Sequence, residues 1–506
     1  MSGRPVEPDV AHSAPGRPLF VAAAPAGAGR GGAGLVAFVP MGYDRLSGLD
    51  ASFLHLESLE TPMQVGALTV LEGEPFFGPE GHFRLADVRD LVASRLHRIP
   101  RFRKRVQRVA LDAGQPVWVD DDHFDVAYHV RLTALPAPGD RAQLLALFER
   151  LQAQLLDRRR PLWELWFVEG LEGGHVGLIQ KTHHALVDGV SGVDVATVLL
   201  DFSPTPVLDE APPWRPEPAP SPGRLLLDTL ADDVTGLAAL ARRGRDPETG
   251  EGGADRVTRI ARSVATLTEG GVVAPRTSLN RPVGRSRRFA GVRVSLDEVK
   301  TVRRVLGGTV NDVVLAGVAG GLGQLLAARD ELRPELTLKA FCPVSVRDED
   351  EHLALGNRVS AMFVPLPVGE PDPVRRLELV RAATAHLKDR EQAVGAAALL
   401  SLTEYAAPTL LSLGARLIHN QPFCNLVCTN VPGPQTPLYC MGARMLEAYP
   451  MVPLSKNMNL GVAILSYCGY LHFGLLGDRE QWPDLEVLEA GLEEAFAELH
   501  KAATDR

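Results

Sequence analysis

Two adjacent histidines, His183 and His184, stand in the stretch KTHHALVDGVSG at residues 181 to 192. The 506-residue chain has only 14 histidines, and this pair follows an apolar run and precedes Asp188 and Gly189. An imidazole, with its ordinary pKa of about 6.5, can accept a proton near neutral pH. Adjacent side chains on an extended segment point in opposite directions, so only one of the two can face a given cleft. The pattern therefore indicates one working histidine and one that packs or positions it.

Three readings of the pair stay open on local sequence alone. The histidines could be structural and hydrogen-bonded in a core turn, one of them could bind a metal together with Asp188, or one could be a general base. Zinc sites take three or four protein ligands. No HExxH or similar spacing supplies the ligands needed beyond one histidine and Asp188, so we expect no metal. No GxSxG nucleophile elbow or Walker A pattern offers a rival catalytic centre.

The composition, with 45% hydrophobic and 23% charged residues, fits two or three globular domains with full cores. A formal charge of −9 disfavours nucleic acid as a partner. The five cysteines form no CxxC pair, which predicts unpaired thiols and a reducing compartment. We find neither a signal peptide nor a run of roughly 20 apolar residues, so we expect a cytoplasmic protein without a transmembrane helix.

Residues 1 to 40 are rich in Gly, Ala and Pro and are predicted to form a flexible tail. Gly27, Gly29 and Gly32 within it match GxGxxG formally. A dinucleotide site needs that motif between a strand and a helix, and here the glycines run into another loop. We therefore expect no bound cofactor.

The patterned sequence divides into a domain at 41–202, a Pro-rich crossover linker with a helical piece at 203–275, and a domain at 276–500. The first domain has predicted helices at 87–97 and 142–156, and two buried strands at 162–171 and 175–184 joined by a Glu-Gly-Gly turn. The second has a predicted helix at 311–329 and strands at 287–296, 338–347 and 425–434, with a hairpin at 463–478. Alternating strands and helices in both halves predict an α/β protein.

The stretch HHALVDG resembles the HHxxxDG signature of the bacterial wax ester synthase/diacylglycerol acyltransferase family. This family belongs to the coenzyme A-dependent acyltransferases, with chloramphenicol acetyltransferase and peptide-synthetase condensation domains. Two further motifs of that family are similar to residues of this chain, PLW at Pro161, Leu162 and Trp163, and ND at Asn311 and Asp312. Residues 46–66 and 429–439 resemble its N-terminal opening and its C-terminal loop. The resemblance covers about 43 to 495, with departures at Gln64, where histidine is expected, and Thr429, where serine is more usual.

The resemblance implies two chloramphenicol-acetyltransferase-like domains with a substrate channel between them. It also implies an acyl-CoA-dependent O-acyltransferase that moves a long-chain acyl group to diacylglycerol, giving triacylglycerol, or to a long-chain fatty alcohol, giving a wax ester. His184 would be the general base and His183 would position it. Asp188 would fix or orient the turn. Gly189 would allow the backbone conformation that a tight turn requires.

The remaining motif residues would shape the site. Asn311 is our candidate for the oxyanion donor, with a plain helix N-cap as the alternative, and Asp312 follows it in the same motif. Pro161, Leu162 and Trp163 would form the core beneath the site rather than contact substrate.

Two rival functions stay open. The chain could be an acyltransferase of the same fold that uses another acceptor, such as a polyketide or a carrier-bound alcohol, or a non-catalytic scaffold that kept the fold. The intact HHALVDG argues against the scaffold. For the main function, acyl-CoA is a co-substrate, and lipid acceptors imply a peripheral association with a membrane or lipid-droplet surface.

Overall fold

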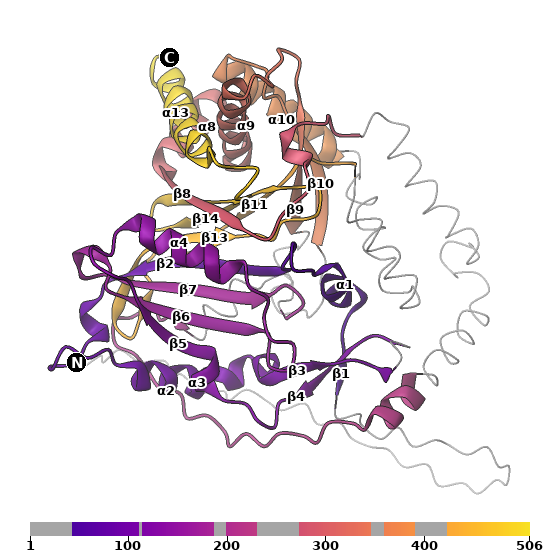
Figure 1. Ribbon diagram of the computed structural model, residues 1–506. Helices are drawn as coiled ribbons and strands as arrows, with labels where there is room; N and C mark the ends of the chain where they lie inside the picture. The colour runs from indigo at the N-terminus through magenta and orange to yellow at the C-terminus, as the bar shows by residue number, and fades with distance from the viewer. Residues whose placement is uncertain (1–42, 111–113, 187–198, 230–272, 346–358, 390–421) are drawn as a thin grey trace, which may run out of the picture. The chain divides into compact units, whose positions relative to one another are not determined.

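The computed structural model describes residues 43–110, 114–186, 199–229, 273–345, 359–389 and 422–506 (Figure 1). These residues belong to one compact unit, Gly42–Arg506. The predicted tail at 1–40, most of the linker's helical piece, and both Asp188 and Gly189 lie outside the described residues.

The first large sheet has six strands in the order β12-β13-β2-β7-β6-β5. Their bounds are β2 Gln64–Leu71, β5 Val130–Ala134, β6 Trp163–Glu169, β7 Val176–His183, β12 Tyr439–Cys440 and β13 Ala443–Met451. The antiparallel β6–β7 pair confirms the two predicted buried strands. Gly173 and Gly174, in the turn between them, adopt φ values of 75° and 70°, a conformation that favours glycine.

Two strands of this sheet, β12 and β13, come from far along the chain. β13 pairs antiparallel with β2, with Met451 opposite Gly66 and Glu447 opposite Val70. A segment that we predicted to lie within the 276–500 domain therefore extends the sheet that carries the histidines. The domain limits themselves stay predictions.

Four helices accompany the first sheet, namely α1 Gly48–Leu56, α2 Leu85–Arg95, α3 Val126–His129 and α4 Arg141–Gln152. Both α2 and α4 were predicted, although α4 ends four residues earlier than expected. Asp140 and Gln143 form a capping box at the start of α4. Leu144, Phe148 and other apolar residues of α4 pack against Leu68 and Ile179 of the sheet. A small separate sheet contains β1 Asp44–Arg45, β3 Lys104–Gln107 and β4 Val117–Asp120.

The second large sheet has the order β10-β9-β11-β14-β15-β8. Its bounds are β8 Arg287–Ser295, β9 Leu338–Ser345, β10 Val359–Leu366, β11 Leu426–Val431, β14 Leu460–Tyr467 and β15 Tyr470–Asp478. β8, β9, β11 and the β14–β15 hairpin confirm the predicted strands. Helices α8 Leu296–Leu306, α9 Val310–Ala328, α10 Pro373–Asp389 and α13 Leu485–Thr504 lie together on one side of this sheet (Figure 1).

Helix α9 is the core helix of this layer. By length and composition it could cross a membrane, a property that the sequence analysis did not assign to any segment, but most of it is buried inside the protein. Its glycines allow close packing, because a Cβ at Gly317 would lie 2.5 Å from the Phe496 ring of α13. The burial of α9 between neighbouring helices and the sheet accounts for its apolar composition.

Candidate active site

The end of β7 presents the two histidines. The His183 amide donates to the Leu162 carbonyl at 2.9 Å, and the His184 amide donates to the Met63 carbonyl at 2.8 Å. Leu162 lies just before β6 and Met63 just before β2, the two strands that flank β7. The backbone of the pair is therefore held from both sides.

His183 uses both of its ring nitrogens within the protein. The side chain is fully buried, and its Nδ1 accepts a hydrogen bond from the Ala185 amide at 3.0 Å. Its Nε2 lies 3.3 Å from Glu57 Oε1, an electrostatic contact rather than a well-aligned hydrogen bond. Since an accepting Nδ1 carries no proton, a neutral ring is protonated at Nε2, the atom that faces the carboxylate. His183 thus has no nitrogen left for a substrate.

His184 is in a different state. Its half-buried ring stacks on Phe53 of α1, with ring centroids 3.9 Å apart and planes at 18°. Its Nδ1 has no hydrogen-bond partner in the described part of the chain. Burial is the main cause that lowers the pKa of His184 to about 4. The imidazole is therefore neutral at pH 7 and can accept a proton.

Glu57, at the end of α1, lies at the centre of the contacts around the pair. Its side chain is 2% exposed, and Oε1 accepts from the Met63 amide at 3.2 Å. Oε2 accepts from Arg158 Nε at 3.1 Å and Nη2 at 2.8 Å. Burial favours the neutral carboxyl, but His183 and Arg158 outweigh burial and lower the pKa of Glu57 to about 2.

No role for Phe53, Glu57 or Arg158 was predicted from the sequence. Phe53 and Glu57 are four residues apart, the spacing that places side chains on one face of a helix. That spacing was the only signal in the sequence, and it did not indicate which strand the helix would face.

The PLW residues lie in the core next to the pair. Pro161, Leu162 and Trp163 are buried, and the Leu162 carbonyl is the acceptor for His183 described above. Trp163 Nε1 donates to the Phe102 carbonyl at 2.8 Å, and its ring stacks on His129 with centroids 4.3 Å apart. These contacts are structural. A part for these residues in substrate binding stays untested.

Gln64, the departure from the family pattern, lies directly opposite His183 in the β2–β7 ladder. Its buried Nε2 donates to the carbonyls of Gln152 at 2.7 Å and Gln154 at 2.8 Å. The amide thereby ties the end of α4 to the start of β2. Lys181, two residues before His183, is also buried, and burial lowers its pKa to about 8 against the attraction of Glu164 and Glu57.

The ND motif lies in the first turn of α9, and Thr309 is its N-cap. Thr309 and Asp312 form a capping box, and Asp312 Oδ1 also accepts from Thr384 of α10 at 2.8 Å. The N-cap alternative for Asn311 is therefore wrong, because the helix begins one residue before it. Asn311 Oδ1 instead accepts from Asn430 Nδ2 at 3.3 Å, which brings the ND motif into contact with the predicted C-terminal loop.

The described residues do not supply a set of ligands for the metal alternative. In the described ranges no three His, Cys, Asp or Glu side chains are grouped so that they could hold a metal ion. Asp188, the third residue of that hypothesis, lies outside these ranges, as does Gly189. The five cysteines, which all lie in the described ranges, form no disulfide bond there.

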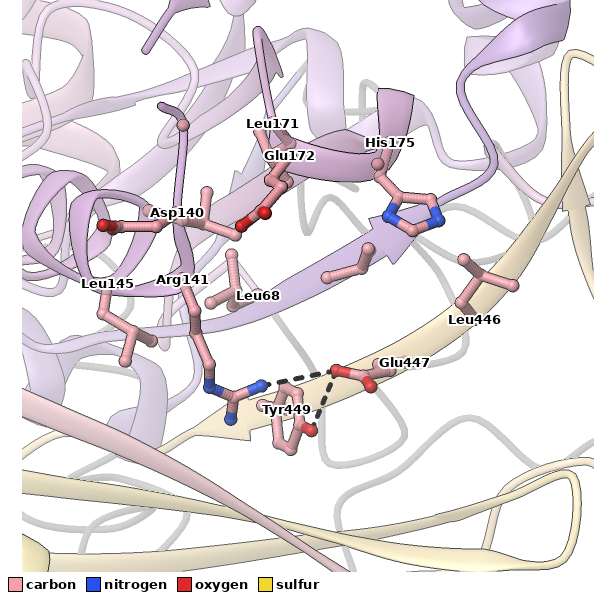
Figure 2. Close-up of a pocket in the computed structure, with 14 residues that line it drawn as sticks. Leu68, Asp140, Arg141, Leu145, Leu171, Glu172, His175, Leu446, Glu447 and Tyr449 are labelled. Atoms are coloured by element: carbon pink, nitrogen blue, oxygen red, sulfur yellow. Dashed lines mark hydrogen bonds and ion pairs between the residues drawn. The ribbon is translucent and has the colours of Figure 1, made fainter. Parts of the chain in front are cut away.

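A pocket of about 330 Å³ lies at the opposite end of β7 (Figure 2). It is lined by the start of α4, the turn before β7, and β13, and Figure 2 shows Arg141, Glu447 and Tyr449 joined at its edge. The eight residues of β7 span roughly 25 Å at ~3.3 Å per residue. This pocket is therefore separate from the histidine pair.

Solved structures of low sequence identity define the fold class. The starter condensation domain of rhizomide synthetase RzmA is 14% identical, with a TM-score of 0.54 over 92% of this chain and 95% of that chain. The trichothecene 15-O-acetyltransferase TRI3 from Fusarium sporotrichioides is 13% identical, with a TM-score of 0.57 over 91% and 95%. The chain thus has a condensation-domain-like fold, which confirms the predicted fold class. The channel between domains stays a prediction.

Closer relatives identify the family. The wax ester synthase/diacylglycerol acyltransferase catalytic domain matches residues 46–314, and the C-terminal domain of the same family matches residues 355–500. The enzyme of that name from Marinobacter aquaeolei VT8 is 29% identical, with a TM-score of 0.66 over 91% of this chain and 100% of that chain. A probable diacylglycerol O-acyltransferase from Mycobacterium tuberculosis, tgs2, is 37% identical over 90% of this chain and 98% of its own. The chain belongs to the wax ester synthase/diacylglycerol acyltransferase family, as the motifs predicted.

Proposed function

We propose that this protein is an acyl-CoA-dependent O-acyltransferase that uses His184 as its general base. The acyl donor is a long-chain acyl-CoA, and the acceptor is diacylglycerol, a long-chain fatty alcohol, or both. The observation that carries the proposal is the contrast within the histidine pair, with His183 tied at both nitrogens and His184 neutral with an unpartnered Nδ1 in the described part of the chain. The family of the chain and the names of its relatives support the substrate class.

The reaction is a direct transfer. A ring nitrogen of His184 removes the hydroxyl proton of the acceptor as that oxygen attacks the thioester carbonyl carbon. The tetrahedral intermediate collapses, the carbon–sulfur bond breaks, and the imidazolium gives its proton to the departing thiolate. The products are an ester and free coenzyme A, with His184 neutral again. A positioned base of this kind contributes about 10² to 10⁴-fold in rate.

The low pKa of His184 suits the second half of this cycle. A pKa of about 4 makes the imidazolium a stronger acid than an ordinary histidine, so that it passes its proton readily to the thiolate. In the first half, the same low pKa keeps the base form populated at neutral pH.

Asn311 is our proposed donor to the oxyanion of the intermediate. Its Oδ1 accepts from Asn430, and its Nδ2 forms no hydrogen bond with any residue in the described ranges. An amide N–H aimed at the developing charge is the type of donor that such sites use. Asp312 supports this arrangement by capping α9 and binding Thr384.

The acceptors in this proposal are lipids, so we also propose that the enzyme works in the cytoplasm at a membrane or lipid-droplet surface. Association would be peripheral, through exposed side chains rather than a spanning helix.

The proposal is tested with purified protein, palmitoyl-CoA, and either dipalmitoylglycerol or hexadecanol. Thiol release and neutral-lipid product are followed together, so that hydrolysis of the thioester is distinguished from transfer. We expect stoichiometric ester and free thiol with at least one acceptor. Thiol release without ester, or no reaction with either lipid, would favour an enzyme of the same fold with a different acceptor.

A further inference from the structure

Glu57 is a buried carboxylate, and none of the motifs of this family in the sequence analysis gives it a role. Removing a charged carboxylate from water is costly unless partners replace the lost hydration. Here both oxygens have partners, with Met63 and His183 on Oε1 and Arg158 on Oε2. These partners come from the start of β2, the end of β7 and the segment before β6, the three strands that meet beside the histidine pair.

We propose that Glu57 is a positioning residue for the catalytic base, acting through His183 and Met63. This inference rests on the proposed function of His184. In this role the carboxylate orients the base and does not contact substrate.

The first route from Glu57 to His184 runs through His183. The negative oxygen favours a proton on the facing Nε2, which leaves Nδ1 free to accept the Ala185 amide at 3.0 Å. Ala185 directly follows His184, so this hydrogen bond fixes the backbone on the C-terminal side of the base. The other tautomer of His183 would place a donor, Nδ1–H, against the Ala185 N–H, and a ring flip would place the Cδ2 carbon there, so either change would remove the acceptor.

The second route runs through Met63. Glu57 Oε1 accepts the Met63 amide, and the Met63 carbonyl accepts the His184 amide at 2.8 Å. One carboxylate oxygen therefore controls the backbone on both sides of the base. The ring of His184 rests on Phe53, which is carried by the same helix.

Arg158 holds the other oxygen of Glu57 and also donates to the Leu54 carbonyl at 2.8 Å. The Arg158 side chain is 40% exposed, whereas the Glu57 side chain is buried. The arginine thus closes the solvent side of the contact and fixes the carboxylate in one orientation.

The test is Glu57→Gln, with Glu60→Gln as the matched control. Glu60 lies three residues further on, its side chain is 41% exposed, and it has its own arginine, Arg285, at 3.0 Å. We expect Glu57→Gln to lower kcat by about ten- to a hundredfold, since small misplacements of a catalytic group cost this much, while KM for both substrates changes less than twofold. Glu60→Gln keeps the wild-type kcat. A Glu57→Gln enzyme as fast as the control, in a protein where His184→Ala is inactive, overturns the inference and leaves the proposed function standing.

Arg158→Gln gives a second variant if Glu57→Gln does not fold, because its side chain reaches the surface. We expect a loss of kcat in the same direction, of about three- to tenfold, again with little change in KM. The double variant Glu57→Gln, Arg158→Gln should fall no further than Glu57→Gln alone, since both act through one carboxylate. Additive losses would contradict this coupling.

The tautomer of His183 gives a measurement that does not depend on activity. In protein with ¹⁵N-labelled histidine, assigned by comparison with His183→Asn, we expect wild-type His183 to carry its proton at Nε2 only. Glu57→Gln should give a mixture of tautomers, and Glu60→Gln should not. An unchanged tautomer in Glu57→Gln would refute the first route even if the wild type transferred no acyl group to the lipids tested.

Discussion

At the scale of single residues, the two histidines differ by what their nitrogens contact. His183 is closed off by Ala185 and Glu57, whereas the Nδ1 of His184 has no partner in the described part of the chain and its pKa is lowered to about 4. The adjacency of the two histidines on an extended segment predicted one working histidine and one that packs or positions it. The contacts support the prediction that the second of the two is the working histidine. Glu57 and Arg158 could not be predicted, because their proximity to His183 depends on how three strands assemble.

Separate substitutions of His183 distinguish its two nitrogens. The amide oxygen of His183→Asn can take the place of Nδ1 and accept the Ala185 N–H, whereas the longer His183→Gln can only replace Nε2 opposite Glu57. We expect kcat to decrease in the order wild type, His183→Asn, His183→Gln. The His183→Asn variant should retain at least about tenfold more activity than His183→Ala, because the buried Ala185 N–H keeps its acceptor. Steady-state kinetics of the three variants measure this. If Asn and Ala were equally impaired, the Ala185 hydrogen bond would not be what positions the base.

At the scale of elements, apolar runs and turn glycines were sufficient to predict β6, β7, β8, β9, β11 and the β14–β15 hairpin. The helix after Thr309 was predicted one residue late, because a Thr-x-x-Asp capping box was not recognised at its start. The Asn311–Asn430 contact was beyond prediction, since it joins two motifs that lie 119 residues apart in the chain. β13 was missed for a related reason, because its partner β2 lies near the other end of the chain.

The capping of α9 leads to a prediction on stability. Asp312→Ala removes the acceptor for Thr309 and for Thr384 together, so we expect it to lower the free energy of unfolding by about 2 kcal/mol. Asp297→Ala is the matched control, an exposed aspartate in the first turn of α8 that contacts Lys300 at the surface. It should cost less than about 0.5 kcal/mol. Urea unfolding measures both, and equal midpoints would show that Asp312 does not hold α9 and α10 together.

At the scale of the whole molecule, the sheet that carries the histidine pair is completed by β12 and β13, two strands from the C-terminal half. The sequence predicted the fold class correctly through local patterns and family motifs. It did not predict that the two halves share a sheet, since strand pairing between distant segments is not encoded by local periodicity.

Buried histidines make the stability of the folded chain depend on pH. Burial lowers the pKa of His129, His184 and His472 to about 4 each, below the ordinary value of about 6.5 in an unfolded chain. The unfolded state therefore binds more protons between these values, and stability falls as pH drops from about 6.5 towards 4. We expect Tm to be nearly constant from pH 8 to 6.5 and to fall steeply below that. His82→Asn, at an exposed position, should give the same curve, whereas a Tm that does not change down to pH 4.5 would contradict the burial of these imidazoles.

The most direct measurement is the kcat of His184→Ala beside that of the wild type, with palmitoyl-CoA and the better of the two lipid acceptors. The variant must show the wild-type circular dichroism and unfolding midpoint. Our account predicts that ester formation falls by at least about a hundredfold, since the acceptor hydroxyl loses its base. Ester formation by the folded variant at the wild-type rate would remove His184 as the base and contradict the account.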